Sequence, residues 1–164
     1  MTTTLLSCAC GKVECEATGS PILTAVCYCD DCQRGARQIG TLPDAAPVID
    51  ADGGTAYVLY RKDRFECAKG RELLRDLRLG ESSPTSRVVA GCCNSAMYLD
   101  FRKGHWVCAY RGRFRAAAPP IQMHIQTRFR PQSDRAPSNI PAYRAFPPLF
   151  FAKILLARIA MLLS

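Results

Sequence analysis

The first two thirds of the chain consist of short apolar stretches separated by turn signals. Residues 13–17 alternate apolar and acidic positions, the period of a half-buried β-strand. Further segments rich in β-forming residues lie between glycine, proline and aspartate turns, at 22–27, 55–60, 64–67, 87–90, 96–101 and 106–110. Many short strands joined by such turns predict a mainly β fold, a sandwich or a barrel-like domain. Residues 32–39 predict one or two helical turns, and 71–79 is ambiguous.

From residue 116 the composition changes. Prolines recur from Pro119 to Pro148, which predicts an irregular segment over 116–148. Residues 149–163 are apolar apart from Lys153 and Arg158, and they predict a helix about 22 Å long, shorter than the ~30 Å hydrocarbon core of a bilayer. We therefore expect no transmembrane span. The helix packs on its own domain or on a partner, for example in a dimer, and contact with a membrane surface is the alternative.

These changes divide the chain into three predicted parts: a β domain over 1–115, the irregular segment over 116–148 and the C-terminal helix over 149–164. At 164 residues the chain is long enough for one domain with a core of its own. The net charge of +8 is unevenly placed, because residues 1–103 hold 13 basic and 13 acidic residues, whereas 104–164 hold nine basic residues and only Asp134. This asymmetry permits an anionic partner without identifying one.

Cysteine spacing carries the clearest chemical signal. Seven of the ten cysteines fall into three clusters: Cys8 with Cys10; Cys27, Cys29 and Cys32; Cys92 with Cys93. The N-terminus has neither a basic nor an apolar signal-peptide region, so we expect a cytoplasmic protein with reduced thiols. Clustered thiols in that compartment are typical of metal sites, and zinc is the metal expected here.

The first and last clusters together supply four sulfurs. Gly11 follows Cys10 and allows a tight turn in which backbone N–H groups point at a sulfur. Cys92 and Cys93 would point to opposite faces of an extended strand, so either the backbone turns there or only one of them is a ligand. Asn94 favours the turn, because asparagine tolerates the left-handed region. We expect both to be ligands, with Cys93 the firmer assignment, in a closed structural site.

The middle cluster supplies three sulfurs, Cys27, Cys29 and Cys32. Three protein ligands leave a fourth position for water or a substrate thiol. The alternative is a closed structural site, whose fourth ligand would be Cys92, Cys67, Cys108 or His105. Otherwise Cys15, Cys67 and Cys108 are interpreted as core residues, and His105 and His124 as surface or internally hydrogen-bonded histidines.

The order Cys-x-Cys-Gly, Cys-x-Cys-x-x-Cys and a late cysteine pair resembles the glutathione-dependent formaldehyde-activating enzyme family, which includes centromere protein V. Residues 27–33 and 91–95 are similar to an uncharacterised bacterial branch of it. The resemblance covers roughly residues 5–110, and it implies a β-tent fold of antiparallel sheets that holds two zinc ions. The structural zinc then belongs to Cys8, Cys10, Cys92 and Cys93, and the second, near the glutathione site, to Cys27, Cys29 and Cys32. This chain differs from the family pattern at Tyr28, where histidine is common, and at Ala90, where a first late cysteine is usual.

Three functions are compatible with these features. The first is a carbon–sulfur lyase that joins or separates a thiol such as glutathione and an aldehyde such as formaldehyde, with zinc holding the thiol as thiolate. The second is a zinc-stapled module that binds nucleic acid or another polyanion through arginines interleaved with aromatics, at 111–115 and 128–130. The third is a redox- or metal-responsive protein. No catalytic residue is assigned from the sequence.

Overall fold

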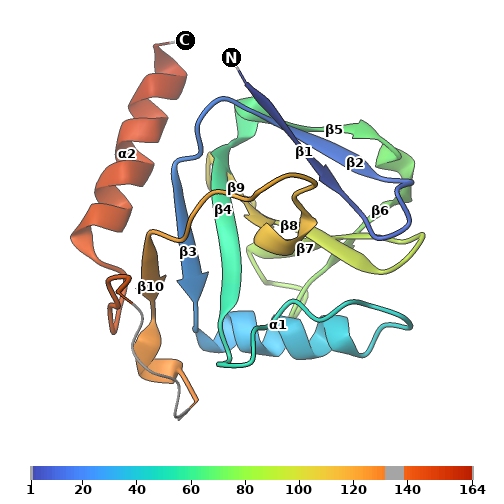
Figure 1. Ribbon diagram of the computed structural model, residues 1–164, viewed down its shortest axis with the longest axis horizontal. Helices are drawn as coiled ribbons and strands as arrows, with labels where there is room; N and C mark the ends of the chain where they lie inside the picture. The colour runs from blue at the N-terminus through green and yellow to red at the C-terminus, as the bar shows by residue number, and fades with distance from the viewer. Residues whose placement is uncertain (1, 132–138, 164) are drawn as a thin grey trace.

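A computed structural model describes residues 2–131 and 139–163 of the chain. The described residues form a mainly β protein with two principal helices (Figure 1). The strands are β1 (Thr3–Ser7), β2 (Glu14–Thr18), β3 (Leu23–Cys27), β4 (Thr55–Arg61), β5 (Phe65–Lys69), β6 (Leu74–Leu77), β7 (Thr85–Ala90), β8 (Ser95–Phe101), β9 (Trp106–Tyr110) and β10 (Met123–Ile125). The helices are α1 (Asp30–Gly40) and α2 (Pro148–Leu162).

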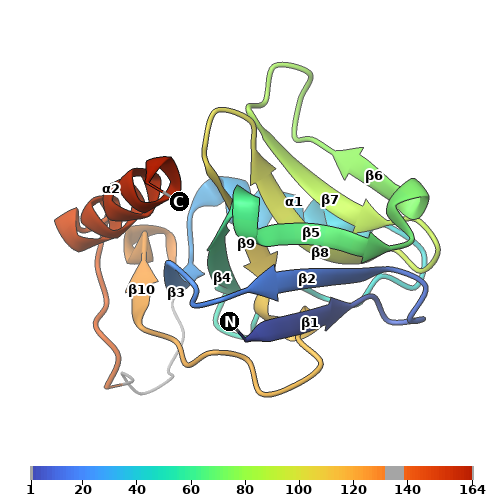
Figure 2. The same ribbon diagram turned by 90° about the horizontal axis from the view of Figure 1, so that it is seen from above.

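The strands form two sheets. A three-stranded sheet has the order β1-β2-β5, and a seven-stranded sheet has the order β10-β3-β4-β9-β8-β7-β6. Neighbouring strands are antiparallel except for β10, which pairs in parallel with β3 at the edge of the larger sheet. Figure 2 shows the small sheet as a separate layer beside the large one, with α1 on the far side.

The side-chain period of β4 explains this layering. Val58 and Tyr60 point into a core between the two sheets, whereas Tyr57 and Leu59 point into a second core on the opposite face. That second core is covered by α1 and α2, which contribute Ile39 and Ile154 respectively. Strands buried on both faces lose the simple apolar–polar alternation, which is why β3 and β4 read as nearly continuous apolar runs.

The strands expected from the sequence are present, and so are both helices. The ambiguous stretch 71–79 contains a 3₁₀ turn followed by β6. Two strands were not predicted: β1, which is mostly polar and partly exposed, and β10, which lies within the segment 116–148 that was expected to be irregular. Residues 132–138 of that segment lie outside the described residues.

Helix α2 lies along the outer side of the molecule, next to β10 and β3 (Figure 1). Only Phe150 and Ile154 of this helix are buried, and several of its leucines are exposed. The imidazole Nε2 of His105 lies 2.9 Å from the carbonyl oxygen of Ile154 and ties the helix to the strand domain. No helix in the described part of the chain is both long and apolar enough to cross a membrane.

Candidate metal centres

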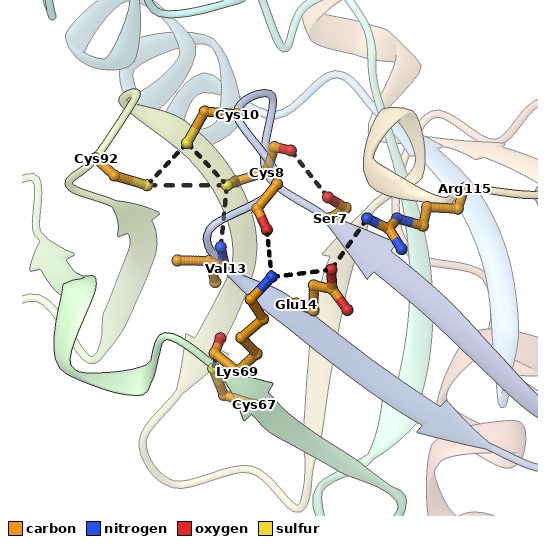
Figure 3. Close-up of polar contacts among 10 residues, drawn as sticks. Ser7, Cys8, Cys10, Val13, Glu14, Cys67, Lys69, Cys92 and Arg115 are labelled. Atoms are coloured by element: carbon orange, nitrogen blue, oxygen red, sulfur yellow. Dashed lines mark hydrogen bonds and ion pairs between the residues drawn. The ribbon is translucent and has the colours of Figure 1, made fainter.

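Four of the predicted cysteines meet where two strand connections face each other. Cys8 and Cys10 lie between β1 and β2, and Cys92 and Cys93 lie between β7 and β8. We call these residues the four-cysteine cluster. Their sulfurs all lie within 4.8 Å of one another. Figure 3 shows three of them as a triangle, in which the Sγ of Cys10 is 3.6 Å from that of Cys8 and 3.4 Å from that of Cys92.

Local backbone geometry aims these sulfurs at one point. Gly11 has a φ of 73°, and its N–H donates to the carbonyl of Cys8. The turn brings the N–H of Val13 to 3.2 Å from the Cys8 sulfur, so that the backbone donates to a sulfur as expected. At the other connection the chain turns through residues 91–94, and Asn94 has a φ of 54°. The adjacent cysteines are therefore not in an extended strand, which removes the geometric objection to both facing one site.

Ser95 joins the two connections behind the sulfurs. Its Oγ accepts a hydrogen bond of 2.9 Å from the N–H of Ala9 and lies 3.2 Å from the Cys93 sulfur. The guanidinium of Arg113 donates to the same oxygen. Such contacts fix the orientation of the side chains that would hold a metal.

Four of the sulfur separations in this cluster lie between 3.4 and 3.9 Å, close to those required by zinc. A tetrahedral zinc with Zn–S bonds of about 2.3 Å needs sulfurs about 3.8 Å apart. The Cys8–Cys92 and Cys92–Cys93 separations are 3.8 and 3.9 Å, and all ten cysteines are free thiols. The donor set and its spacing therefore fit a tetrahedral thiolate site.

The other three predicted cysteines also converge, at the junction of β3 and α1. Cys27 ends β3, Cys29 is the N-cap residue of α1, and Cys32 lies in its first turn. Their sulfurs lie within 4.8 Å of one another, and we call them the three-cysteine cluster. Hydrogen bonds from the Cys27 and Cys32 thiols lower the pKa of Cys29 to about 3. The positive end of the α1 dipole acts in the same direction.

None of the four alternative ligands joins this cluster among the described residues. Cys92 belongs to the four-cysteine cluster. The thiol of Cys67 donates to the carbonyl of Lys69 in β5, and His105 contacts α2. Cys108 faces the same cavity as the cluster but lies outside the group of converging sulfurs. Cys15 is fully buried, as expected of a core residue, whereas Cys67 and Cys108 are partly buried.

A cavity of about 440 Å³ adjoins the three-cysteine cluster. All three of its cysteines line this cavity, together with one face of the large sheet and the N-terminal half of α2. The hydroxyl of Tyr57, also in the wall, donates to the Cys32 sulfur over 3.6 Å. The three sulfurs therefore border a space that can admit a small molecule, and we call it the cysteine cavity.

Arg87 is the buried cation of the cysteine cavity, and it was not among the predicted site residues. It lies in β7, is only 2% exposed, and its guanidinium donates to the carbonyl of Asp31. Its Nε and Nη1 have no hydrogen-bond partner among the described residues. Its charge also contributes to lowering the pKa of Cys29, after the hydrogen bonds from the other two thiols. An arginine placed directly before the apolar run Val88–Ala90 was the available signal.

Tyr28, the residue that replaces the family's usual histidine, is fully buried behind the three-cysteine cluster. Its hydroxyl donates to Asp52 over 2.7 Å and lies 2.9 Å from Nδ1 of His124. Arg130 binds the same carboxylate of Asp52 and lies over the Tyr28 ring. The side chain thus belongs to a polar network and does not line the cysteine cavity, and His124 is internally hydrogen-bonded.

The arginines near residue 111 make intramolecular contacts. Residues 111–113 form a 3₁₀ turn, and the Arg111 guanidinium donates to the carbonyls of Ala118 and Pro119. Arg115 pairs with Glu14 at 3.0 Å, and Glu14 also contacts Lys69 (Figure 3). None of these arginines borders the cysteine cavity.

The sequence matches a known protein family over most of its length. The model of the glutathione-dependent formaldehyde-activating enzyme family matches residues 3–126, which include both clusters. The chain belongs to this family. The match extends beyond residues 5–110, the approximate range of the resemblance seen in the cysteine motifs. It includes β10, so the parallel edge strand lies within the family region.

A solved protein from Rhodobacter sphaeroides has a similar fold. Its TM-score is 0.50 at 16% sequence identity, over 72% of this chain and 92% of that protein. At this identity the likeness concerns the fold alone. No functionally curated protein matches the chain. Membership of the glutathione-dependent formaldehyde-activating enzyme family supports a glutathione-related, zinc-binding protein in general terms, and the geometry of the cysteines is compatible with zinc.

Proposed function

We propose that this protein is a zinc-dependent carbon–sulfur lyase that forms or cleaves the bond between a thiol and an aldehyde. The observation that carries the proposal is the position of the three-cysteine cluster. Its three sulfurs lie close together, and the same three cysteines line a cavity of about 440 Å³. Glutathione and formaldehyde are the substrates that family membership suggests.

Two zinc ions are proposed, with different roles. Cys8, Cys10, Cys92 and Cys93 would hold the structural ion, because four thiolates complete a tetrahedron. Cys27, Cys29 and Cys32 would hold the second ion, which keeps one position open toward the cysteine cavity. A zinc ion bound by three thiolates supplies a position at which a thiol binds in its deprotonated, nucleophilic form.

The reaction at that position is an addition to a carbonyl group. The thiolate sulfur forms a bond to the aldehyde carbon, the carbonyl π electrons move to oxygen, and that oxygen takes up the proton released by the thiol. The reverse sequence releases thiol and aldehyde. The cavity wall, including Tyr57 and Leu59, contributes by holding both reactants close together and by excluding water.

The positive charge of Arg87 is complementary to the charge expected of a zinc-loaded three-cysteine cluster. Three thiolates and one zinc ion carry a net charge of −1, and the guanidinium of Arg87 is a buried cation without a carboxylate partner in the described part of the chain. An unpaired buried charge is costly, and a negatively charged metal centre nearby would offset the cost of burying this arginine. We propose that Arg87 is a positioning residue that stabilises the thiolate form of the cluster.

The polyanion-binding alternative has weaker support. Arg111, Arg113 and Arg115 contact backbone carbonyls, a serine and a glutamate of their own chain. Engaged guanidinium groups can contact phosphates only by giving up or sharing these partners.

Cobalt substitution tests the proposal. In the first measurement, the full chain is loaded with Co²⁺ and its absorption spectrum is recorded as 2-mercaptoethanol is added. In the second, the zinc-loaded chain is mixed with 2-mercaptoethanol and formaldehyde, and NMR measures the rate at which the S-(hydroxymethyl) adduct forms and breaks down. We expect the thiol to increase thiolate-to-cobalt absorption and the zinc-loaded protein to accelerate the exchange. Cys29→Ser should abolish both effects, whereas Cys67→Ser, a change in a partly buried thiol outside both clusters, should preserve them. Equal acceleration by Cys29→Ser and the unchanged protein, or no spectral response to the thiol, would contradict the proposal.

A further inference from the structure

The cysteine cavity is walled mainly by apolar side chains. The sheet contributes Leu59, Leu99 and Trp106, and α2 contributes Phe150, Phe151 and Ile154. Aromatic and aliphatic side chains therefore form the cavity wall both on the side of the sheet and on the side of α2. A wall of this kind stabilises a ligand by taking apolar surface out of water, and it offers few hydrogen bonds.

The charges in the wall are few and nearly balanced. Apart from the cysteines, Asp31 and Arg87 are the charged residues that line the cavity in the described part of the chain. The Arg87 guanidinium already donates to a backbone carbonyl, and the Asp31 carboxylate is exposed at the edge and close to Arg34. A zinc ion on the three-cysteine cluster adds a net charge of −1.

Glutathione matches this wall poorly. It carries two carboxylates, one ammonium and two amides, all of which lose hydrating water when they enter a cavity. Arg87 can pair with at most one of the carboxylates, and the negative charge of the metal centre repels both. An uncharged thiol with an aliphatic or aromatic body loses no such hydration and gains contact with Trp106, Phe150 and Phe151.

We propose that the preferred thiol of this protein has an apolar aromatic or aliphatic body, and that glutathione binds weakly. This inference rests on the proposed function, because it takes the three-cysteine cluster as the position at which the thiol sulfur binds. It changes the expected substrate class from a charged peptide thiol to an apolar one.

The test compares benzyl mercaptan with glutathione on the zinc-loaded full chain. Binding would be measured by anaerobic isothermal titration calorimetry. We expect the Kd of benzyl mercaptan to be at least tenfold lower than that of glutathione. The Phe151→Ala variant should raise the benzyl mercaptan Kd about three- to tenfold and leave the glutathione Kd nearly unchanged.

The matched control is Leu156→Ala on the same helix. Phe151 and Leu156 are 58% and 64% exposed, but only Phe151 lines the cavity. Leu156→Ala should leave both Kd values unchanged. A glutathione Kd equal to or below that of benzyl mercaptan, or equal effects of the two substitutions, would overturn the inference while leaving thiol binding at the metal in place. Absence of binding by either thiol would instead overturn the proposed function, and the inference with it.

Discussion

Gly35 allows the Arg87 guanidinium to lie against α1. A Cβ atom at this position would lie 1.8 Å from the Nε and 2.2 Å from the Cζ of Arg87. Glycine inside a helix costs about 1 kcal/mol relative to alanine, so it stabilises α1 less than any other small residue would. The close approach of a buried guanidinium is a physical reason for glycine at this position.

Replacing Gly35 with alanine should therefore destabilise the protein although alanine favours helices. We expect a loss of about 1–3 kcal/mol in the free energy of unfolding, because the guanidinium must move away from the new methyl group. Gly40→Ala, at the end of the same helix, is the control: nothing lies within 4 Å of its Cβ position, and the change should be neutral or stabilising by less than about 1 kcal/mol. Chemical denaturation of both variants checks this, and equal shifts would contradict it.

At the scale of elements, the segment from β10 to Arg130 holds the loop that carries the three-cysteine cluster. The N–H of Tyr28 donates to the carbonyl of Ile125. The Gln33 side chain donates to the carbonyls of Tyr28 and Phe129, each over 2.8 Å. These hydrogen bonds from a distant segment, β10 and the turn after it, fix the course of the backbone between Cys27 and α1.

Asp52 is the acceptor at the centre of this network. Its partial burial disfavours the charged form, but hydrogen bonds from Tyr28 and the Gly54 N–H, with the Arg130 charge, outweigh burial and lower its pKa. A carboxyl group whose pKa is lowered by folding stabilises the protein fully above its ordinary pKa of about 3.9. That stabilisation is lost as the pH falls through the lowered pKa of the folded protein.

Asp52→Asn should reduce the free energy of unfolding by about 1–3 kcal/mol at pH 7, because buried donors lose a charged acceptor. The difference from the unchanged protein should shrink below about pH 4 and should not grow there. Asp63→Asn serves as a comparison, since Asp63 is more exposed than Asp52 and its ion pair with Arg61 should contribute less to stability. Denaturation curves of the three proteins across pH would show whether the Asp52 effect follows this pattern.

At the scale of the whole molecule, the two cysteine clusters belong to different cores. Three members of the four-cysteine cluster pack with the core between the two sheets, while the three-cysteine cluster belongs to the core under the helices. The first cluster therefore adds a link between two layers that are also held by side-chain packing and by the hydrogen bond from Ala9 to Ser95. The second borders a cavity, so its metal would contribute more to chemistry than to folding.

The two clusters should respond differently to loss of one ligand. Cys10→Ser should remove one zinc ion and destabilise the sheet contact, with a loss on the order of several kcal/mol, less than the ~10–16 kcal/mol of zinc-finger peptides because the domain has its own core. Cys29→Ser should remove one zinc ion with the fold intact. Metal content combined with hydrogen exchange checks this: faster exchange in β1 and β2 is expected for Cys10→Ser alone. Equal unfolding by both variants would assign a structural role to both clusters.

Much of this protein was determined by local sequence. Apolar–acidic alternation specified β2, and runs of β-forming residues between turn signals specified most other strands. The cysteine spacings specified the three-cysteine cluster and each half of the four-cysteine cluster, because residues two or three apart on a turn can aim at one point. Asn94 and Gly11 marked the backbone turns that the four-cysteine cluster requires.

The remaining features depended on contacts between distant segments. β1 and β10 carry weak local signals and are strands because partners pair with them, in β10's case in parallel with β3. The residues next to Arg87 in the sequence do not indicate that its guanidinium packs against Gly35 or that its charge lies beside the cysteine cavity. The cavity itself is a space between a sheet and two helices, and such a space is defined only once long-range packing has brought its walls together.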